Sequence, residues 1–300
     1  MNPSPPRLFD RPLLRRRLDR AAKTFAQADF LKVRAAQDVV ERLEPIMRRF
    51  PLAVDLGVRG GAFARALTGS DAAGKIDLLI QTELCPALLA PAGPRVVADE
   101  ERLPFKEASL DLVVSTLALH WTNDLVGALV QIRRALKPDG LFIGAFLGGA
   151  TLTELRQSLL AAEEEISGGA AMRVSPFAEP SDGGSLLKRA GFALPVTDVD
   201  RVTVRYAHPI ELLRDLRRMG ETSVLADRPR RPMTRALLMR AMQIYVERFA
   251  QADGRVPATF EIITLTGWTP HESQQQPLPR GSAKMRLEDA LTAVKREREG

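Results

Sequence analysis

Cysteine is nearly absent from this sequence of 300 residues, in which Cys85 is the single example. One cysteine excludes a framework of intramolecular disulfides, and such usage is typical of proteins that fold in a reducing compartment. Cys85 lies in an apolar segment. We therefore expect a buried, unreactive thiol at this position rather than a nucleophile.

Long hydrophobic runs are also missing, because no apolar stretch approaches the ~20 residues that a membrane-spanning helix requires. Residues 1–20 lack the apolar centre of a secretory signal. They are rich in arginine, as transit peptides are, but Asp10 and Asp19 argue against that interpretation. These absences predict a cytoplasmic protein without a membrane span, for which peripheral contact with the inner membrane stays open.

Aromatic residues make up only 5% of the chain, and there are three histidines. The net charge of +6 would suit an anionic partner. The arginines are scattered, however, and no basic patch is interleaved with aromatic residues, so we expect no nucleic-acid partner. His120, His208 and His271 are too dispersed to predict metal ligation, and no metal site is expected.

What the sequence does contain is a regular alternation of apolar runs with helical patterns and turns. The runs are continuous, as is typical of strands buried in parallel sheets. Such alternation predicts an α/β fold with a doubly wound parallel sheet, whose core spans residues 50–146. The predicted strands are the run ending at Asp55–Gly57, then Lys75–Thr82, Arg95–Ala98, Leu110–Thr116 and Leu141–Phe146.

After residue 147 the pattern is looser, and it predicts two groups of elements. Helical patterns over about 147–190 and 209–251 predict a helical lid above the carboxyl edge of the sheet. Alternating patterns predict the last strands at about 197–206 and 260–267. The expected organisation is a loose basic N-terminus (1–20), one domain (21–272) and a polar tail (273–300).

Acidic residues stand at the ends of three consecutive predicted strands, at Asp55, Glu83 and Asp99. Ligands of open parallel sheets bind outside the carboxyl ends of the strands. A carboxylate after the second strand can accept both hydroxyls of a ribose, and one after the third can accept from a purine amine. Taken singly, each acid is better explained as a helix cap or a solvated loop residue. Together with the glycine turn of Gly57 and Gly61, they predict a nucleoside-type cofactor site.

The glycine spacing does not match a dinucleotide fingerprint, which requires a third glycine inside the helix. The run Asp55-Leu56-Gly57-x-x-x-Gly61, followed by Glu83 and Asp99-Glu100, instead resembles the S-adenosylmethionine site of class I methyltransferases. This resemblance implies a mostly parallel, seven-stranded sheet and S-adenosylmethionine as the cofactor. The cofactor contacts that it implies come from Asp55, Gly57, Gly61, Glu83, Asp99 and Glu100.

Further motifs follow one another over nearly the whole chain. They include FDR at Phe9–Arg11, ADEERLPFKE, LDLVVSTLALHWTNDL and the carboxyl-terminal GW-x-x-HES. In this order they resemble mitochondrial complex I assembly factor 5 and its alphaproteobacterial relatives. The resemblance implies a protein substrate, a complex I (NADH dehydrogenase) subunit, whose arginine is methylated or, as described for the family, hydroxylated. Malonyl-carrier-protein methyltransferases look like more distant relatives, mainly over residues 50–146.

Two histidine-containing motifs supply candidates for catalysis and substrate binding. Methyl transfer needs little beyond alignment of the nucleophile and removal of its proton. His120, after the fourth strand, is a candidate base or substrate hydrogen-bonding group, with Trp121 on the substrate side. A structural pair packed under the lid would explain His120 and Trp121 equally well. His271 and Glu272 are further substrate-side candidates, although a polar turn fixing the last strand also accounts for them.

One residue departs from the family pattern Asp-Leu-Gly-x-Gly-x-Gly, because Arg59 stands at the middle glycine. A side chain there takes room from the cofactor and can strain the backbone. Either Gly60 takes over the role with reduced affinity, or the pocket is degenerate and the protein is a non-catalytic factor that binds a complex I subunit. We expect cofactor binding to be retained. A carboxyl methyltransferase acting on a small molecule or a carrier protein is a further alternative.

Overall fold

The computed structural model describes residues 7–169, 171–228 and 232–275. It divides into two compact units, Met1–Pro270 and His271–Gly300, and the described helices and strands belong to the first. Most of the polar tail predicted for 273–300 lies outside the described residues. Within the described ranges, no helix is both long enough and apolar enough to cross a membrane.

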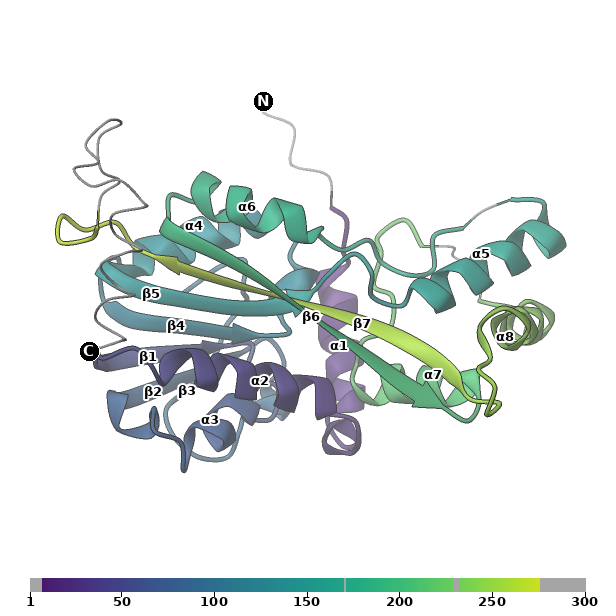
Figure 1. Ribbon diagram of the computed structural model, residues 1–300, viewed down its shortest axis with the longest axis horizontal. Helices are drawn as coiled ribbons and strands as arrows, with labels where there is room; N and C mark the ends of the chain where they lie inside the picture. The colour runs from purple at the N-terminus through teal and green to yellow at the C-terminus, as the bar shows by residue number, and fades with distance from the viewer. Residues whose placement is uncertain (1–6, 170, 229–231, 276–300) are drawn as a thin grey trace, which may run out of the picture. The chain divides into compact units, whose positions relative to one another are not determined.

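A seven-stranded sheet forms the centre of the first unit, in the order β3-β2-β1-β4-β5-β7-β6 (Figure 1). Neighbouring strands are parallel from β3 to β5, whereas β7 is antiparallel to both β5 and β6. The predicted α/β fold with a doubly wound, mostly parallel seven-stranded sheet is therefore confirmed. The strands are β1 (Phe50–Leu56), β2 (Ile76–Glu83), β3 (Arg95–Val97), β4 (Leu110–Thr116), β5 (Leu136–Leu147), β6 (Ala193–Tyr206) and β7 (Val256–Trp268).

Successive residues of the central strands pack on opposite faces of the sheet, as the pleat requires. Ala53 and Leu112 pack with helices α2 and α3 on one face. Val54 and Val113 pack with α4 and α6 on the other. The continuous apolar runs of the sequence thus become a sheet buried between two helical layers. The bounds are α2 (Phe30–Leu43), α3 (Ala62–Leu67), α4 (Leu125–Ala135) and α6 (Gly183–Arg189), with short 3-10 helices η1 (Phe25–Gln27), η2 (Ala73–Lys75), η3 (Pro86–Leu88), η4 (Leu119–Trp121) and η5 (Pro180–Asp182).

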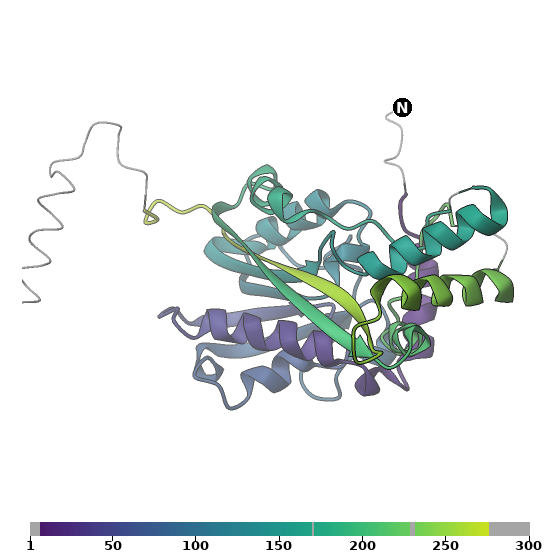
Figure 2. The ribbon, with the colours of Figure 1, turned by 45° about the vertical axis from the view of Figure 1, so that its right-hand side comes forward.

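The helices predicted as a lid divide into two groups. Helices α5 (Thr153–Ser167), α7 (Pro209–Arg218) and α8 (Arg235–Phe249) form one hydrophobic cluster with ends of β5, β6 and β7. Figure 2 shows α5 and α8 side by side beyond the sheet. Helix α6 departs from the predicted lid of 147–190, because its apolar residue Leu187 packs on the sheet beside α4.

The N-terminal segment also departs from the prediction, which was a loose basic arm over 1–20. Its described part contains helix α1 (Arg11–Ala21), which is capped by the carboxylate of Asp10. Leu14 and Leu18 are buried on this helix and pack in one cluster with Cys85. The spacing of four residues between the leucines places both on one face of the helix. The predicted burial of Cys85 is confirmed, and burial raises the pKa of its thiol.

Candidate functional site

The glycine turn after β1 brings the backbone close to neighbouring loops. Gly57 has a φ of +75°, and a Cβ there would stand 2.3 Å from the Cβ of Ala118. Gly61 has a φ of +78°, and a Cβ there would stand 2.7 Å from the Cβ of Ala90. Only glycine meets both conditions, the left-handed backbone and the close approach. The sequence-predicted turn is therefore tightly packed against its own surroundings.

Arg59 occupies the position of the missing family glycine in the left-handed region, with a φ of 35°. Its backbone N–H donates to Glu83 Oε2 at 3.0 Å. Its guanidinium is buried and forms an ion pair with Glu221 Oε1. A non-glycine residue in this region costs on the order of 1 kcal/mol, so the two contacts offset strain in the turn.

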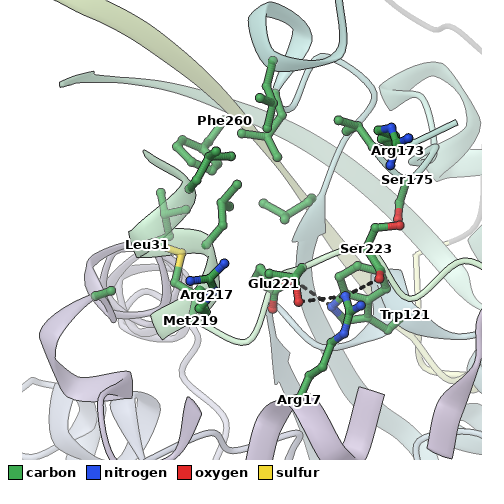
Figure 3. A pocket seen from close by; sticks show the side chains of 18 of the residues that line it. Arg17, Leu31, Trp121, Arg173, Ser175, Arg217, Met219, Glu221, Ser223 and Phe260 are labelled. Atoms are coloured by element: carbon green, nitrogen blue, oxygen red, sulfur yellow. Dashed lines mark hydrogen bonds between the residues drawn. The ribbon is translucent and has the colours of Figure 1, made fainter. Parts of the chain in front are cut away.

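Glu221 accepts hydrogen bonds from three side chains. Besides Arg59, these are His120 Nε2 at 3.1 Å and Trp121 Nε1 at 2.7 Å, both to Oε2. Figure 3 shows Trp121 beside Glu221. Burial by itself would raise the pKa of Glu221, but Arg59 and His120 outweigh it and lower the pKa to about 2. Glu221 is therefore ionised at neutral pH and acts only as an acceptor.

The partner of His120 fixes its tautomer. Because the carboxylate of Glu221 carries no proton, His120 Nε2 must be the protonated nitrogen. His120 Nδ1 is then a lone-pair acceptor, and it is buried with no hydrogen-bond partner in the described part of the chain. Burial lowers the pKa of His120 despite the attraction of Glu221, so the ring is neutral. This state is the one that a base requires.

A buried lysine bridges the switch point of the sheet between β1 and β4. Lys32 Nζ donates to the carbonyl of Gly57 at 2.6 Å and to that of Thr116. Asp55 lies nearby and is fully buried, and neither carboxylate oxygen has a hydrogen-bond partner among the described residues. Burial raises the pKa of Asp55 and lowers that of Lys32, while each charge favours the other.

The other predicted cofactor acids are engaged by groups of the chain itself. Glu83 accepts the backbone N–H groups of Arg59 and Cys85, one on each oxygen. Arg11 Nη2 donates to Asp99 Oδ1 at 2.5 Å and also pairs with Glu100. Arg11 is only 8% exposed, and its other terminal nitrogen donates to the carbonyl of Trp121.

A cavity of about 580 Å³ opens beside this network, between the sheet and α5, α7 and α8. Arg59, Lys32, Trp121 and Glu221 line it, and most of the remaining lining side chains are apolar. The predicted cofactor residues Asp55, Gly57, Gly61, Glu83, Asp99 and Glu100 are not among the lining residues. The residue types suit a nucleoside. In this arrangement Arg11 pairs with Asp99 and Glu100 and backbone N–H groups donate to Glu83, so a bound S-adenosylmethionine would have to displace these groups. The oxygens of Asp55 have no partner among the described residues.

Two substrate-side candidates belong to the second unit. His271 Nδ1 lies 2.7 Å from Ser273 Oγ, and both His271 and Glu272 are exposed. Their role toward a substrate stays a prediction. Within residues 7–169, 171–228 and 232–275, no three His, Cys, Asp or Glu side chains are grouped to hold a metal ion.

Sequence reasoning missed three residues of the site: Lys32, Arg11 and Glu221. Lys32 carried a signal, because it stands four residues before Ala36 and seven before Val39, on the apolar face of α2. The sequence signal for Arg11 was weaker: this residue lies in the FDR motif and begins a helix. Glu221 lies between helices in a polar segment, where no periodic pattern distinguishes a site residue.

Comparisons with known proteins agree with this fold. A family described as "Methyltransferase domain" matches residues 54–144. The zebrafish (Danio rerio) protein "Arginine-hydroxylase NDUFAF5, mitochondrial" is 42% identical over 94% of this chain and 89% of its own length. The "Malonyl-[acyl-carrier protein] O-methyltransferase" of Halorhodospira halophila is 35% identical over 89% of this chain and 91% of its own.

Among solved structures, a methyltransferase from Bacillus halodurans superposes with a TM-score of 0.53 at 15% identity. The match covers 78% of this chain and 99% of that one, and it supports the fold. The relatives also correct one expectation. We predicted a cytoplasmic protein, but the NDUFAF5 relative is a mitochondrial protein, so the prediction from cysteine usage and the acidic N-terminal residues is wrong. Both features suit any reducing, soluble compartment and do not single out the cytoplasm.

Identity of 42% along almost the whole length is far above what a shared fold alone produces. The methyltransferase domain, the strand order and the acid-bearing strand ends point the same way. The chain therefore belongs to the S-adenosylmethionine-dependent methyltransferase class of enzymes and, within it, to the family of the arginine hydroxylase NDUFAF5.

Proposed function

We propose that this enzyme modifies an arginine side chain of an NADH dehydrogenase subunit while complex I is assembled. The observation that carries the proposal is the 42% identity to an arginine hydroxylase over 94% of the chain. The FDR and GW-x-x-HES motifs support the link to complex I assembly. The carboxyl methyltransferase alternative is weaker, since its relative is 35% identical.

The proposed cofactor is S-adenosylmethionine, supported by the methyltransferase domain over residues 54–144. Asp55, Glu83, Asp99 and Glu100 are the proposed cofactor contacts. Binding requires that Arg11 leaves Asp99 and Glu100, and that Glu83 exchanges at least one of its backbone donors for the ligand. The two free oxygens of Asp55 support this assignment, because buried carboxylate oxygens normally have partners.

His120 is the proposed proton acceptor or substrate hydrogen-bonding group. Its neutral ring and unpartnered Nδ1 support that role. Trp121 lines the cavity and holds Glu221, which suits a position on the substrate side. His271 and Glu272 are proposed to contact the protein substrate from the carboxyl-terminal motif.

Mass spectrometry of NADH dehydrogenase subunits tests this function. In a strain that lacks the gene, we expect one arginine to lose the mass of an oxygen atom (hydroxylation) or of a methylene group (methylation). Re-expression of the wild-type chain should restore the mark, whereas His120→Ala should not. Arg214→Gln, an exposed residue outside the cavity lining, serves as the matched control. Unchanged subunit masses would instead support a non-catalytic binding factor.

A further inference from the structure

The cavity beside Glu221 has the size and the wall of a small-molecule site. Its volume of about 580 Å³ lies within the range of ligand pockets. Leu155, Leu159 and Phe260 are buried apolar residues of its lining. An apolar wall of this kind favours a hydrocarbon group, because water in contact with it is released on binding.

The charge of the lining favours an anion. Six cationic residues and two acidic residues line the cavity. Both acids are already paired, Glu221 with Arg59 and Asp29 with Arg65. The cationic residues are Arg17, Lys32, Arg59, Arg173, Arg217 and Arg228.

Three of these cations are poorly neutralised. Within the described residues, Arg17 donates to two neutral oxygens, those of Thr222 and Ser223. Burial and the positive charges of Arg228 and Arg20 lower the pKa of Arg17, and the charge of Asp10 opposes them in part. Arg228 has a single acid partner at 3.3 Å. The exposed side chain of Arg217 has no hydrogen-bond or ion-pair partner in the described part of the chain.

The lining also contains hydroxyl groups without partners. Ser175 Oγ and Ser223 Oγ are buried and have no hydrogen-bond partner among the described residues. Buried polar atoms are normally paired, so two orphans on one cavity indicate a missing polar group. Figure 3 shows Arg17 and Arg217 on either side of Glu221, with Ser175 and Ser223 across from Arg217.

We propose that this cavity binds an amphipathic anion, with its hydrocarbon chain among the leucines and its carboxylate or phosphate held by Arg17, Arg217 and Arg228. Such a ligand would match the apolar wall, neutralise the crowded arginines and supply acceptors to the free hydroxyls. The proposal goes beyond the proposed arginine modification, because the bound anion need not react. It would also lower the repulsion that these arginines exert on a cationic substrate side chain.

Calorimetric titration of the full chain with single-tailed probes below their micelle concentrations tests this site. Decanoate and decyl phosphate represent a fatty acid and a phospholipid headgroup, while decanol and decyltrimethylammonium are the neutral and cationic counterparts. We expect at least one anion to bind about tenfold more tightly than decanol, as charge-assisted hydrogen bonds predict. The preferred anion identifies the source of the ligand. Equal binding of anion and decanol, tighter binding of the cation, or no binding of either anion would overturn the proposal.

Three variants locate the binding. Arg217→Gln should weaken binding of the preferred anion about fivefold and leave decanol binding unchanged, because one exposed charge is lost. Arg214→Gln, on the same helix but outside the lining, should change neither. Leu213→Trp should block the cavity and abolish binding of both probes, with thermal melting as the check on folding. Undiminished binding by Leu213→Trp, or an equal loss in both arginine variants, would contradict the assigned site.

Discussion

At the scale of single residues, the site depends on the side chains that donate hydrogen bonds to Glu221. Its two oxygens accept from Arg59, His120 and Trp121, which come from the glycine turn and η4. Arg59 keeps a left-handed backbone that a glycine would adopt without cost. The ion pair between Arg59 and Glu221 therefore links the position that departs from the glycine pattern to the ring of His120, whose Nδ1 has no partner among the described residues. Removing one partner of such a pair is expected to be costly, because the other charge stays buried.

Glu221→Gln should accordingly destabilise the protein. The pKa of Glu221 is about 2 in the folded chain against an ordinary value of 4.5, and at ~1.4 kcal/mol per pH unit this difference corresponds to roughly 3.5 kcal/mol. Urea unfolding at neutral pH should show a loss of about this size. The exposed Glu164→Gln should lie within roughly 0.5 kcal/mol of the wild type.

The same carboxylate makes stability depend on pH in a defined window. Because its folded-state pKa is below the unfolded-state value, the stabilisation is complete above about pH 4.5 and is lost as pH falls toward 2. The difference between wild type and Glu221→Gln should therefore shrink across that interval. A difference that stays constant there would mean that the Glu221 charge does not contribute.

The sequence predicted where the acidic residues at the strand ends lie, but it did not predict which residues pair with them. The positions of Asp55 and Glu83 follow from strand periodicity, since both close an apolar run. Which group satisfies each acid depends on contacts between distant segments. Arg11 meets Glu100 across 89 residues of sequence, and Arg59 meets Glu221 across 162. No local pattern specifies such pairs.

At the scale of elements, helix α1 decides whether the acids after β3 are accessible. Its first residue, Arg11, covers Asp99 and Glu100, and its leucines anchor it in the cluster around Trp121. A cofactor that needs these carboxylates must compete with the guanidinium. The fraction of molecules with Arg11 displaced therefore sets the apparent affinity.

Arg11→Gln should raise the affinity for S-adenosylmethionine by about tenfold, because a neutral amide competes less well for the carboxylates. Calorimetric titration of wild type and variant measures this directly. Arg16→Gln, exposed on the same helix, controls for changes in net charge. Weaker binding by Arg11→Gln would contradict the competition and place Arg11 among the groups that contact the cofactor.

Helices and strands with a regular pattern of apolar residues were predictable from the sequence. Elements whose position depends on distant packing partners were not. The predicted strand at Leu110–Thr116 is β4 to the residue, and all seven of its residues are buried around the apolar run Leu112–Val114. Helix α1 was missed because its leucine stripe is narrow among six charged residues in eleven. Helix α6 was placed in the lid because sequence order does not state which layer a short helix joins.

At the scale of the whole molecule, the hydrophobic clusters belong to the first unit. Their described members extend from Phe9 to Trp268, and none lies after Pro270. The carboxyl-terminal motif therefore divides: Gly267 and Trp268 end β7, while His271 and Glu272 belong to the second unit. Trp268 packs against a hydrophobic cluster, and this packing accounts for its place in the motif. Packing does not account for His271 and Glu272, because both side chains are exposed.

A chain that ends after Pro270 separates the two explanations for His271 and Glu272. Because no cluster member is removed, we expect the melting temperature and the affinity for S-adenosylmethionine to stay at wild-type values. If the two residues contact the protein substrate, the arginine mark on NADH dehydrogenase should nevertheless disappear, and the full-length double variant His271→Ala, Glu272→Ala should lose it too. A lowered melting temperature would show instead that the motif fixes the last strand. Retention of the mark by both chains would remove His271 and Glu272 from the substrate side.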